Sequence, residues 1–452
     1  MQIIPQLRDL EHEFERELVV IGVHSPKFTA ERRPENLRAA ILRHGLTHPV
    51  VNDNEYAVWQ SYGVRAWPTL MFIDPRGYVY AKHEGEFPLQ PVRELLRDMI
   101  ADYDAEGLID RTPLPLEPLT DEDRPLRFPG KILADPEEDR LFVADSGHRR
   151  VLVVRTDGTV LQTIGAGTRG FTDGSFAEAT FAFPLGLALS PDRQTLYIAD
   201  QENHALRAAD LNAGTVRTVA GTGARGRIGP GGPGRQTALA SPWDLVFRDG
   251  LLWIAMAGMH QLWTYDPATE TVRPAAGTGV ESIHDGPLAE ATFAQPQGIT
   301  VQDGILYVAD SESSAIRRVD PVADRVRRLV GRGLFDFGDI DARGDSVRLQ
   351  HVQGVAATVE DGAPVVYLAD TYNDKIKRLV PETREVTTVL GGDGHGHVDG
   401  DAATAEFWEP SGLSIAGRTL YIADTNNHAI RAADLDRGEV RTIEIKEPAT
   451  GS

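Results

Sequence analysis

The feature that most constrains the fold is a short motif that recurs along most of the chain. Each copy has an apolar run, usually closed by Ala-Asp, then a polar turn and the start of a second strand-like run. Successive copies lie 54 to 60 residues apart. The copies begin with LFVADSGHRRV at 141, LYIADQENHAL at 196, LWIAMAGMHQL at 252, LYVADSESSAI at 306, VYLADTYNDKI at 366 and LYIADTNNHAI at 420. Repetition at this period indicates stacked units, because one such unit cannot bury its apolar faces alone.

The sequence around each copy predicts four short strands per unit. A Pro-x-Gly strand such as FPLGLAL lies upstream, and an alternating strand and a fourth strand such as VRTVAGTG follow downstream. Four strands in each of six units predict a six-bladed β-propeller, in which each blade is a four-stranded sheet. The content of 44 Gly and 28 Pro agrees with a fold rich in turns. These motifs resemble NHL repeats, and the resemblance implies an all-β propeller over residues 128–446.

The Ala-Asp carboxylates have two interpretations. A ring of metal ligands is one of them. The favoured one is structural, because an Asp at a strand end accepts hydrogen bonds from the backbone N–H groups of the following turn and fixes the hairpin. The residues concerned are Asp145, Asp200, Asp310, Asp370 and Asp424.

The third unit differs from the others and is the candidate binding region of the propeller. Met256 replaces the Asp of the motif, and Asp244 stands where other units have Gly. Trp243 and His260 add an aromatic ring and an imidazole nearby. Such enrichment suits a surface that binds a protein or peptide, but a core repacked around the lost Asp explains it equally well.

The long connections between units are expected on one face of the propeller, which is the default binding face. Three of them end in Phe181, Phe293 and Phe407, which are interpreted as wedges between blades. The run DGHGH at 393–397 offers two His side chains, but no third ligand follows at a fixed spacing, so no metal site is predicted.

Residues 1–110 alternate helical and strand patterns and are expected to form an α/β domain. Helical spacing of apolar residues predicts helices at 5–17, 34–45, 55–64 and 89–103. Apolar and β-branched runs predict strands at 18–25, 48–53, 68–74 and 78–85.

This order of elements, with Trp67-Pro68-Thr69 entering the last hairpin, resembles the thioredoxin-like fold of the redoxin type. The resemblance implies a cis bond before Pro68 and a substrate groove at Trp67, Pro68 and Thr69. The alternative is that Pro68 only starts an edge strand.

The thioredoxin resemblance conflicts with the absence of cysteine from the whole chain. The resemblance implies a first strand and a Cys-x-x-Cys pair directly ahead of Met1. Either the native chain begins upstream, or the domain has lost that strand and serves as a docking platform. Loss of the strand would expose a sheet edge and remove core area from a small domain.

Charge and composition bear on partners and compartment. Lys and Arg number 46 against 67 Asp and Glu, and the net charge of -21 opposes phosphate backbones and anionic membranes. We therefore expect no nucleic-acid or membrane partner. Neither a membrane span nor a signal peptide is visible, so the cytoplasm is the expected compartment, and no cofactor is predicted. Residues 111–127 are Pro-rich and acidic and are interpreted as a linker.

The combination resembles NHL-repeat-containing proteins that carry an N-terminal thioredoxin-like domain; the small β domain that animal members add after the propeller is not seen here. Three functions are considered. The first is a protein-interaction scaffold without chemistry of its own. The second is a thiol–disulfide oxidoreductase whose cysteines lie upstream of the given start. The third is a metal-dependent hydrolase or lyase in the propeller channel, for which the inner strands offer mainly Gly and apolar residues, with Asp244 as the exception.

Overall fold

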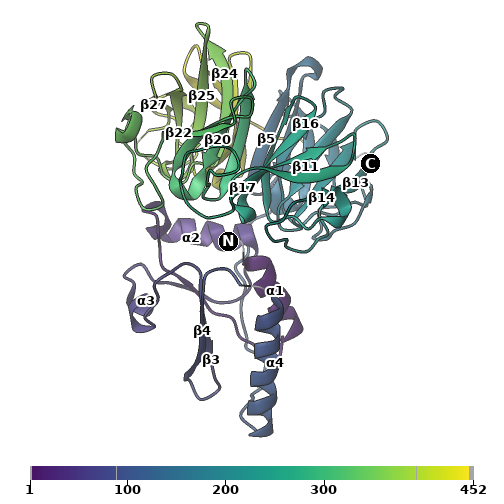
Figure 1. The fold of residues 1–452 in the computed structure, drawn as a ribbon, viewed down its shortest axis with the longest axis vertical. Helices are drawn as coiled ribbons and strands as arrows, with labels where there is room; N and C mark the ends of the chain where they lie inside the picture. Colours follow the sequence, from purple (N-terminus) through teal and green to yellow (C-terminus); the bar gives the residue numbers. More distant parts are fainter. Residues whose placement is uncertain (1–2, 88, 393, 447–452) are drawn as a thin grey trace. The chain divides into compact units, whose positions relative to one another are not determined.

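A computed structural model describes residues 3–87, 89–392 and 394–446 (Figure 1). Contacts within the chain divide it into two compact units, Met1–Glu122 and Asp123–Ser452. Residues 111–127, the predicted linker, contain no helix or strand.

The first unit has the order of helices and strands that the sequence predicts. Its elements are α1 (Ile4–Glu13), β1 (Gly22–His24), a 3-10 turn η1 (Ala30–Arg32), α2 (Pro34–His44), β2 (Val50–Asn52), α3 (Ala57–Ser61), β3 (Thr69–Ile73), β4 (Val79–Glu84) and α4 (Leu89–Ala105). Proline in the first turn starts both α1 and α2, where its missing N–H costs no helical hydrogen bond. Helix α2 ends at Gly45, whose φ of +57° suits a left-handed C-cap.

The strands of this unit form two separate pairs. β1 pairs with β2 in parallel, and β3 pairs with β4 antiparallel. None of the residues of these four strands is buried. The predicted strand at 18–25 was wrong in extent, because only Gly22–His24 is extended and Val19 and Ile21 are 51% and 58% exposed. A thioredoxin-like sheet is therefore not established by this unit.

The core of the first unit lies between two helices and the hairpin. Leu10 of α1 and Phe14, which caps the end of that helix, pack with Phe87 and with Val92 and Leu96 of α4. Figure 1 shows α1 and α4 side by side, with the hairpin β3–β4 next to them. The apolar faces of α1 and α4 thus contribute to one core, whereas none of the residues of the four strands is buried.

The second unit is a six-bladed β-propeller, as predicted. Within the described residues, each blade is an antiparallel sheet of four strands, which an extra two-residue strand extends in four blades. Figure 1 labels many of the strands. The blades are β5 (Pro129–Asp135), β6 (Arg140–Asp145), β7 (Arg150–Arg155) and β8 (Val160–Ile164); β10 (Pro184–Leu189), β11 (Thr195–Asp200), β12 (Ala205–Asp210) and β13 (Thr215–Ala220) with β9 (Gly174–Ser175); β15 (Pro242–Arg248), β16 (Leu251–Met256), β17 (Gln261–Asp266) and β18 (Thr271–Ala276) with β14 (Gly232–Pro233); β19 (Pro296–Gln302), β20 (Ile305–Asp310), β21 (Ala315–Asp320) and β22 (Arg325–Val330); β24 (Gly354–Glu360), β25 (Ala363–Asp370), β26 (Lys375–Val380) and β27 (Glu385–Leu390) with β23 (Ala342–Arg343); and β29 (Pro410–Ala416), β30 (Thr419–Asp424), β31 (Ala429–Asp434) and β32 (Glu439–Ile443) with β28 (Gly400–Asp401).

Neighbouring blades are joined by a repeated hydrogen bond. The residue that closes each polar turn adopts a left-handed conformation, and in five blades its side chain accepts a hydrogen bond from a backbone N–H of the next blade. The pairs are His204 with Ser241, His260 with Gln295, Ser314 with His351, Asp374 with Glu409 and His428 with Phe128. The last pair joins the sixth blade to the first, so it closes the ring.

Candidate functional site

In the first unit, the predicted groove residue Trp67 has an exposed indole that its neighbours hold in place. The Trp67 side chain is 43% exposed, yet its Nε1–H donates to the carbonyl of Ser25 at 2.8 Å. The Trp59 ring packs on it with 4.4 Å between centroids. The Trp67–Pro68 bond is cis, and the Thr69 hydroxyl donates to the carbonyl of Ala66 at 2.7 Å. Trp67 is thus fixed in place while one side of it faces solvent.

A buried carboxylate organises this aromatic pair. Asp53 accepts a hydrogen bond from the Ser25 hydroxyl at 2.8 Å and from the backbone N–H groups of Val58 and Trp59 at 2.9 Å. Burial opposes its ionisation, but these hydrogen bonds outweigh burial and lower the pKa of Asp53. The same carboxylate therefore holds the N-terminus of α3, which carries Trp59, and Ser25, to which Trp67 is bonded.

In the propeller, the Ala-Asp carboxylates are structural in their contacts. All five are fully buried. The sequence predicted that the backbone donors lie in the turn that follows each Asp. They lie instead in the segment ahead of the first strand of the blade. These donors are Arg127 for Asp145, Ala182 and Phe183 for Asp200, Ala294 for Asp310, Gln350 for Asp370 and Trp408 for Asp424. Burial raises the pKa of Asp370 to about 7 and that of Asp424 to about 6.

A buried cation on the third strand links each of four carboxylates to the long connection of its blade. In the second blade, Arg207 donates to Asp200 at 3.3 Å and to Asp173 of the connection at 2.9 Å. The equivalent cations are Arg317, Lys377 and Arg431. We call this arrangement the blade clamp.

The predicted wedge residues lie directly against three of these cations. The guanidinium groups of Arg207, Arg317 and Arg431 lie 5.0 to 5.2 Å from the ring centroids of Phe181, Phe293 and Phe407, respectively. Each ring is fully buried in an apolar cluster with side chains of two neighbouring blades.

The third blade lacks the clamp, and its unusual residues are mostly internal. Met256 is fully buried and Trp243 is 7% exposed, so neither forms an exposed binding surface. Trp263 stands at the position of the cation, and its indole N–H donates to Gln261, which itself donates to the carbonyl of Gly277 at 2.7 Å. His260 takes part in the bond between blades that was described above. The repacked-core interpretation fits these contacts.

Asp244 lies at the centre of the propeller in a polar plug. The Lys131 Nζ is 3.1 Å from Asp244 Oδ2, and it also donates to the carbonyls of Gln297 at 2.9 Å and Gln353 at 2.7 Å. Burial lowers the pKa of Lys131 and raises that of Asp244, and their mutual attraction opposes both changes. Lys131 therefore ties the first blade to the third, fourth and fifth.

Glycine allows the inner strands to approach one another around this plug. A Cβ added at Gly412 would lie 2.7 Å from Lys131 Cα, and one added at Gly298 would lie 2.6 Å from the carbonyl oxygen of Gln353. Sequence comparison of the units pointed to Asp244 but missed Lys131. A signal for Lys131 does exist in the sequence. Lys131 in the first blade and Asp244 in the third each stand two residues after the first Pro of their blade, and they have opposite charges.

No metal centre is evident in residues 3–87, 89–392 and 394–446, where no three His, Cys, Asp or Glu side chains are placed to hold an ion. His397 is hydrogen-bonded to Thr442 at 3.0 Å, and His395 packs on the Trp408 ring with 5.8 Å between centroids. Asp393 of the same run lies outside the described residues.

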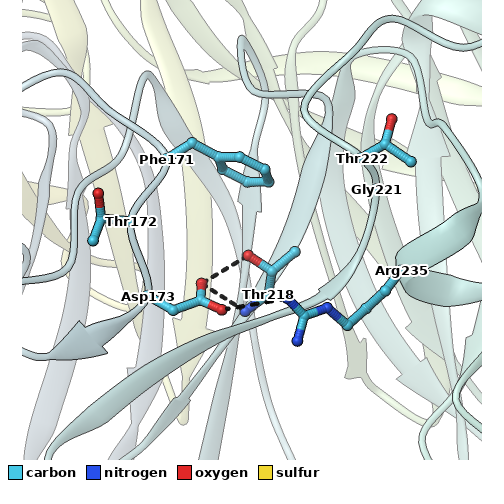
Figure 2. A pocket seen from close by; sticks show the side chains of 7 residues that line it. All are labelled: Phe171, Thr172, Asp173, Thr218, Gly221, Thr222 and Arg235. Atoms are coloured by element: carbon cyan, nitrogen blue, oxygen red, sulfur yellow. Dashed lines mark hydrogen bonds and ion pairs between the residues drawn. The ribbon is translucent and has the colours of Figure 1, made fainter.

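A surface hollow of about 470 Å³ opens between the second and third blades. It is lined by Phe171, Thr172, Asp173, Thr218, Gly221, Thr222 and Arg235. Figure 2 shows the Phe171 ring above the Asp173 carboxylate, which is bonded to Thr218 and faces the Arg235 guanidinium. The hollow combines an aromatic face, hydroxyl groups and an exposed cation.

Comparison with known proteins finds one repeat model and several longer proteins to which this chain is similar. Residues 293–318 match the model of the NHL repeat. The chain is 40% identical over 470 residues to Protein SUPPRESSOR OF QUENCHING 1, chloroplastic, of Arabidopsis thaliana, covering 99% of the chain and 44% of that protein. It is 38% identical over 482 residues to human NHL repeat-containing protein 2, covering 98% of the chain and 66% of that protein. The chain thus spans less than two thirds of either relative.

Two further comparisons are partial. Thiol-disulfide oxidoreductase ResA of Halalkalibacterium halodurans is 27% identical over 96 residues, which are 21% of the chain and 51% of that protein. A structural genomics protein of unknown function from Bacteroides thetaiotaomicron has a TM-score of 0.51 at 16% identity, covering 68% of the chain and 69% of that structure. The second likeness concerns the fold alone. Among the described residues, no helix is long and apolar enough to cross a membrane.

Proposed function

We propose, from the premise that the chain is an NHL repeat protein homologous to NHL repeat-containing protein 2, that it acts as a protein-interaction scaffold. Its first unit, in this proposal, is a thioredoxin-like domain that binds an extended segment of a partner beside Trp67. The propeller supplies a second, rigid surface.

The observation that carries the proposal is the state of the Trp67 indole. It is 43% exposed but is held by the hydrogen bond to Ser25 and by packing on Trp59. A large aromatic side chain that is fixed before binding loses little conformational entropy when a partner covers it, and Trp is enriched among residues that dominate binding energy. The channel supports the same conclusion, since Asp244 is engaged by Lys131 and is not a free ligand for a catalytic metal.

The test is a selection of phage-displayed random 12-residue peptides on the full wild-type chain, after which the selected peptides are titrated with wild type and with the Trp67→Ala variant. Selected peptides are expected to bind Trp67→Ala more weakly by at least about 2 kcal/mol, roughly thirty-fold. Tyr78→Ala is the matched control, because Tyr78 is an aromatic residue of the same unit that is 70% exposed, and it should bind within about two-fold of wild type.

The interpretation depends on whether the Trp67 variants stay folded and on how tightly they bind the selected peptides. Circular dichroism of Trp67→Ala and of the milder Trp67→Phe checks that the unit stays folded; Trp67→Phe keeps a ring and loses only the bond to Ser25. Peptides that bind wild type and folded Trp67→Phe and Trp67→Ala equally would refute a role for Trp67 in binding.

Thiol–disulfide exchange is a second candidate, favoured by the partial similarity to Thiol-disulfide oxidoreductase ResA. The 452 residues contain no cysteine, so this reaction would need cysteines carried outside them. Intact mass and N-terminal sequence of the protein from its native source decide the matter. A Cys-x-x-Cys ahead of MQIIPQL supports the candidate, and a native chain starting at Met1 contradicts it.

A further inference from the structure

The connection between the second and third blades has an unusual charge. Residues 221–239 contain Arg225, Arg227 and Arg235 and no acidic residue, which gives a net charge of +3 in a chain of net charge -21. The connections at 165–181, 277–293, 331–349 and 391–407 have net charges of -1, -3, -1 and -4, respectively.

The missing blade clamp explains why this connection lacks an acid. In the four clamped blades, an Asp of the connection pairs with the buried cation, as Asp173 does with Arg207 at 2.9 Å. The third blade has the uncharged Trp263 at that position, so its connection needs no carboxylate. The arginines of the connection are therefore not there to neutralise an acid of the clamp.

At least two of these arginines are available to a partner. The Arg235 side chain is 67% exposed, and within the described part of the chain its one contact with an acid is at 3.9 Å to Asp173, whose carboxylate already pairs with Arg207. Arg227 is exposed and forms no ion pair within the described part of the chain. Arg225 is held inward, since it donates to the carbonyl of Gly258 at 3.4 Å.

Apolar side chains lie next to these cations. Ile228 is 57% exposed and lies against Gly279, beside Val280, which is 60% exposed. Phe171 is 37% exposed and forms one wall of the hollow in Figure 2, to which Arg235 also contributes. We define the arginine surface as Phe171, Arg227, Ile228 and Arg235.

We propose that the arginine surface binds an acidic peptide segment that carries an aromatic or large aliphatic residue. The carboxylates pair with the planar guanidinium groups of Arg227 and Arg235, which suit bidentate hydrogen bonds. The apolar residue of the peptide enters the hollow against Phe171. Nucleic acid fits less well, because the net charge of -21 repels a phosphate backbone.

This inference rests on the proposed scaffold function but concerns a second surface, so the two can fail separately. The probe is a fluorescein-labelled peptide, EEDLEEFDEE, titrated with the full chain and followed by fluorescence anisotropy at low salt. Arg227→Glu/Arg235→Glu should bind about ten-fold more weakly, since opposite charges at a binding surface become like charges. Phe171→Ala should weaken binding about three-fold or more at constant charge.

The matched control is Arg437→Glu/Arg441→Glu, which changes the net charge equally at two exposed arginines of the sixth blade. It should bind the peptide within about two-fold of wild type, as should Trp67→Ala. Thermal unfolding of each variant confirms that the propeller is intact.

Several outcomes would overturn the inference. They are no binding of the peptide by wild type, equal loss in the two charge-reversal pairs, or tighter binding of a labelled oligouridylate of ten nucleotides than of the peptide. The last result would assign the surface to nucleic acid.

Discussion

At the level of single residues, the bonds between blades make stability depend on pH. Burial and then the charge of Arg225 lower the pKa of His204 from 6.5 to about 4. The folded state thus binds fewer protons than the unfolded state between these values, so the free energy of unfolding is highest above pH 6.5 and falls as the pH drops toward 4. The full effect is about 3 kcal/mol.

We expect His204→Asn to reduce this pH dependence, as measured by urea unfolding at several pH values. Asn tolerates the left-handed backbone, and Asp374 already accepts the equivalent hydrogen bond through a side-chain oxygen in the fifth blade. His260→Asn, at the same position of the third blade, is the control because His260 is not fully buried. An unchanged pH dependence in His204→Asn would show that other groups cause it.

Single residues also mark what the sequence could predict of the candidate site. The Asp residues of the repeat were interpreted as structural because they recur, and Trp67 was singled out by its resemblance to a known motif. Lys131 was missed, because its match with Asp244 shows only when the first strands of the units are aligned at their first Pro, and its role depends on Asp244 lying across the channel 113 residues later. The hydrogen bonds that fix Trp67 were likewise hidden, since Ser25 and Asp53 are remote in sequence.

At the level of elements, the blade clamp fixes the long connections to the blades. Arg207 donates to the carbonyls of Thr172 and Thr180 as well as to Asp173 and Asp200. Arg207→Met would leave a buried carboxylate without its cation, and we expect a loss of about 3 to 5 kcal/mol in the free energy of unfolding. We also expect faster hydrogen exchange over residues 170–181, measured by mass spectrometry.

The third blade supplies the control for this prediction. Gln261→Met removes a buried, uncharged side chain of the third strand of this blade, which donates to the carbonyl of Gly277 and accepts from the indole N–H of Trp263. Its expected cost is about 1 kcal/mol, because no charge is left unpaired. Equal losses in the two variants would show that the cations stabilise the blades only by packing.

Strands could be predicted from the sequence where each repeat unit places its strands in the same packing environment. In the propeller, every strand has strands on both sides or a neighbouring blade against its face, so alternation reports burial directly. In the first unit, the apolar run at 18–25 has the pattern of a buried strand, but only Gly22–His24 pairs, and only with β2. The run is apolar, as the pattern indicates, but among the described residues β1 has β2 as its one strand partner, and none of its residues is buried.

For the whole molecule, these differences predict unequal stability of the two units. None of the residues of β1 to β4 is buried, and Val79 is 54% exposed, whereas Leu196 and Ile198 of β11 are fully buried. Local opening costs least where few apolar contacts are lost. Amides of β3 should therefore exchange at least about 100-fold faster than those of β11 in hydrogen exchange of the full chain. Equal protection of the two strands would contradict this expectation and would mean that β3 is covered in solution, by a second copy or by another partner.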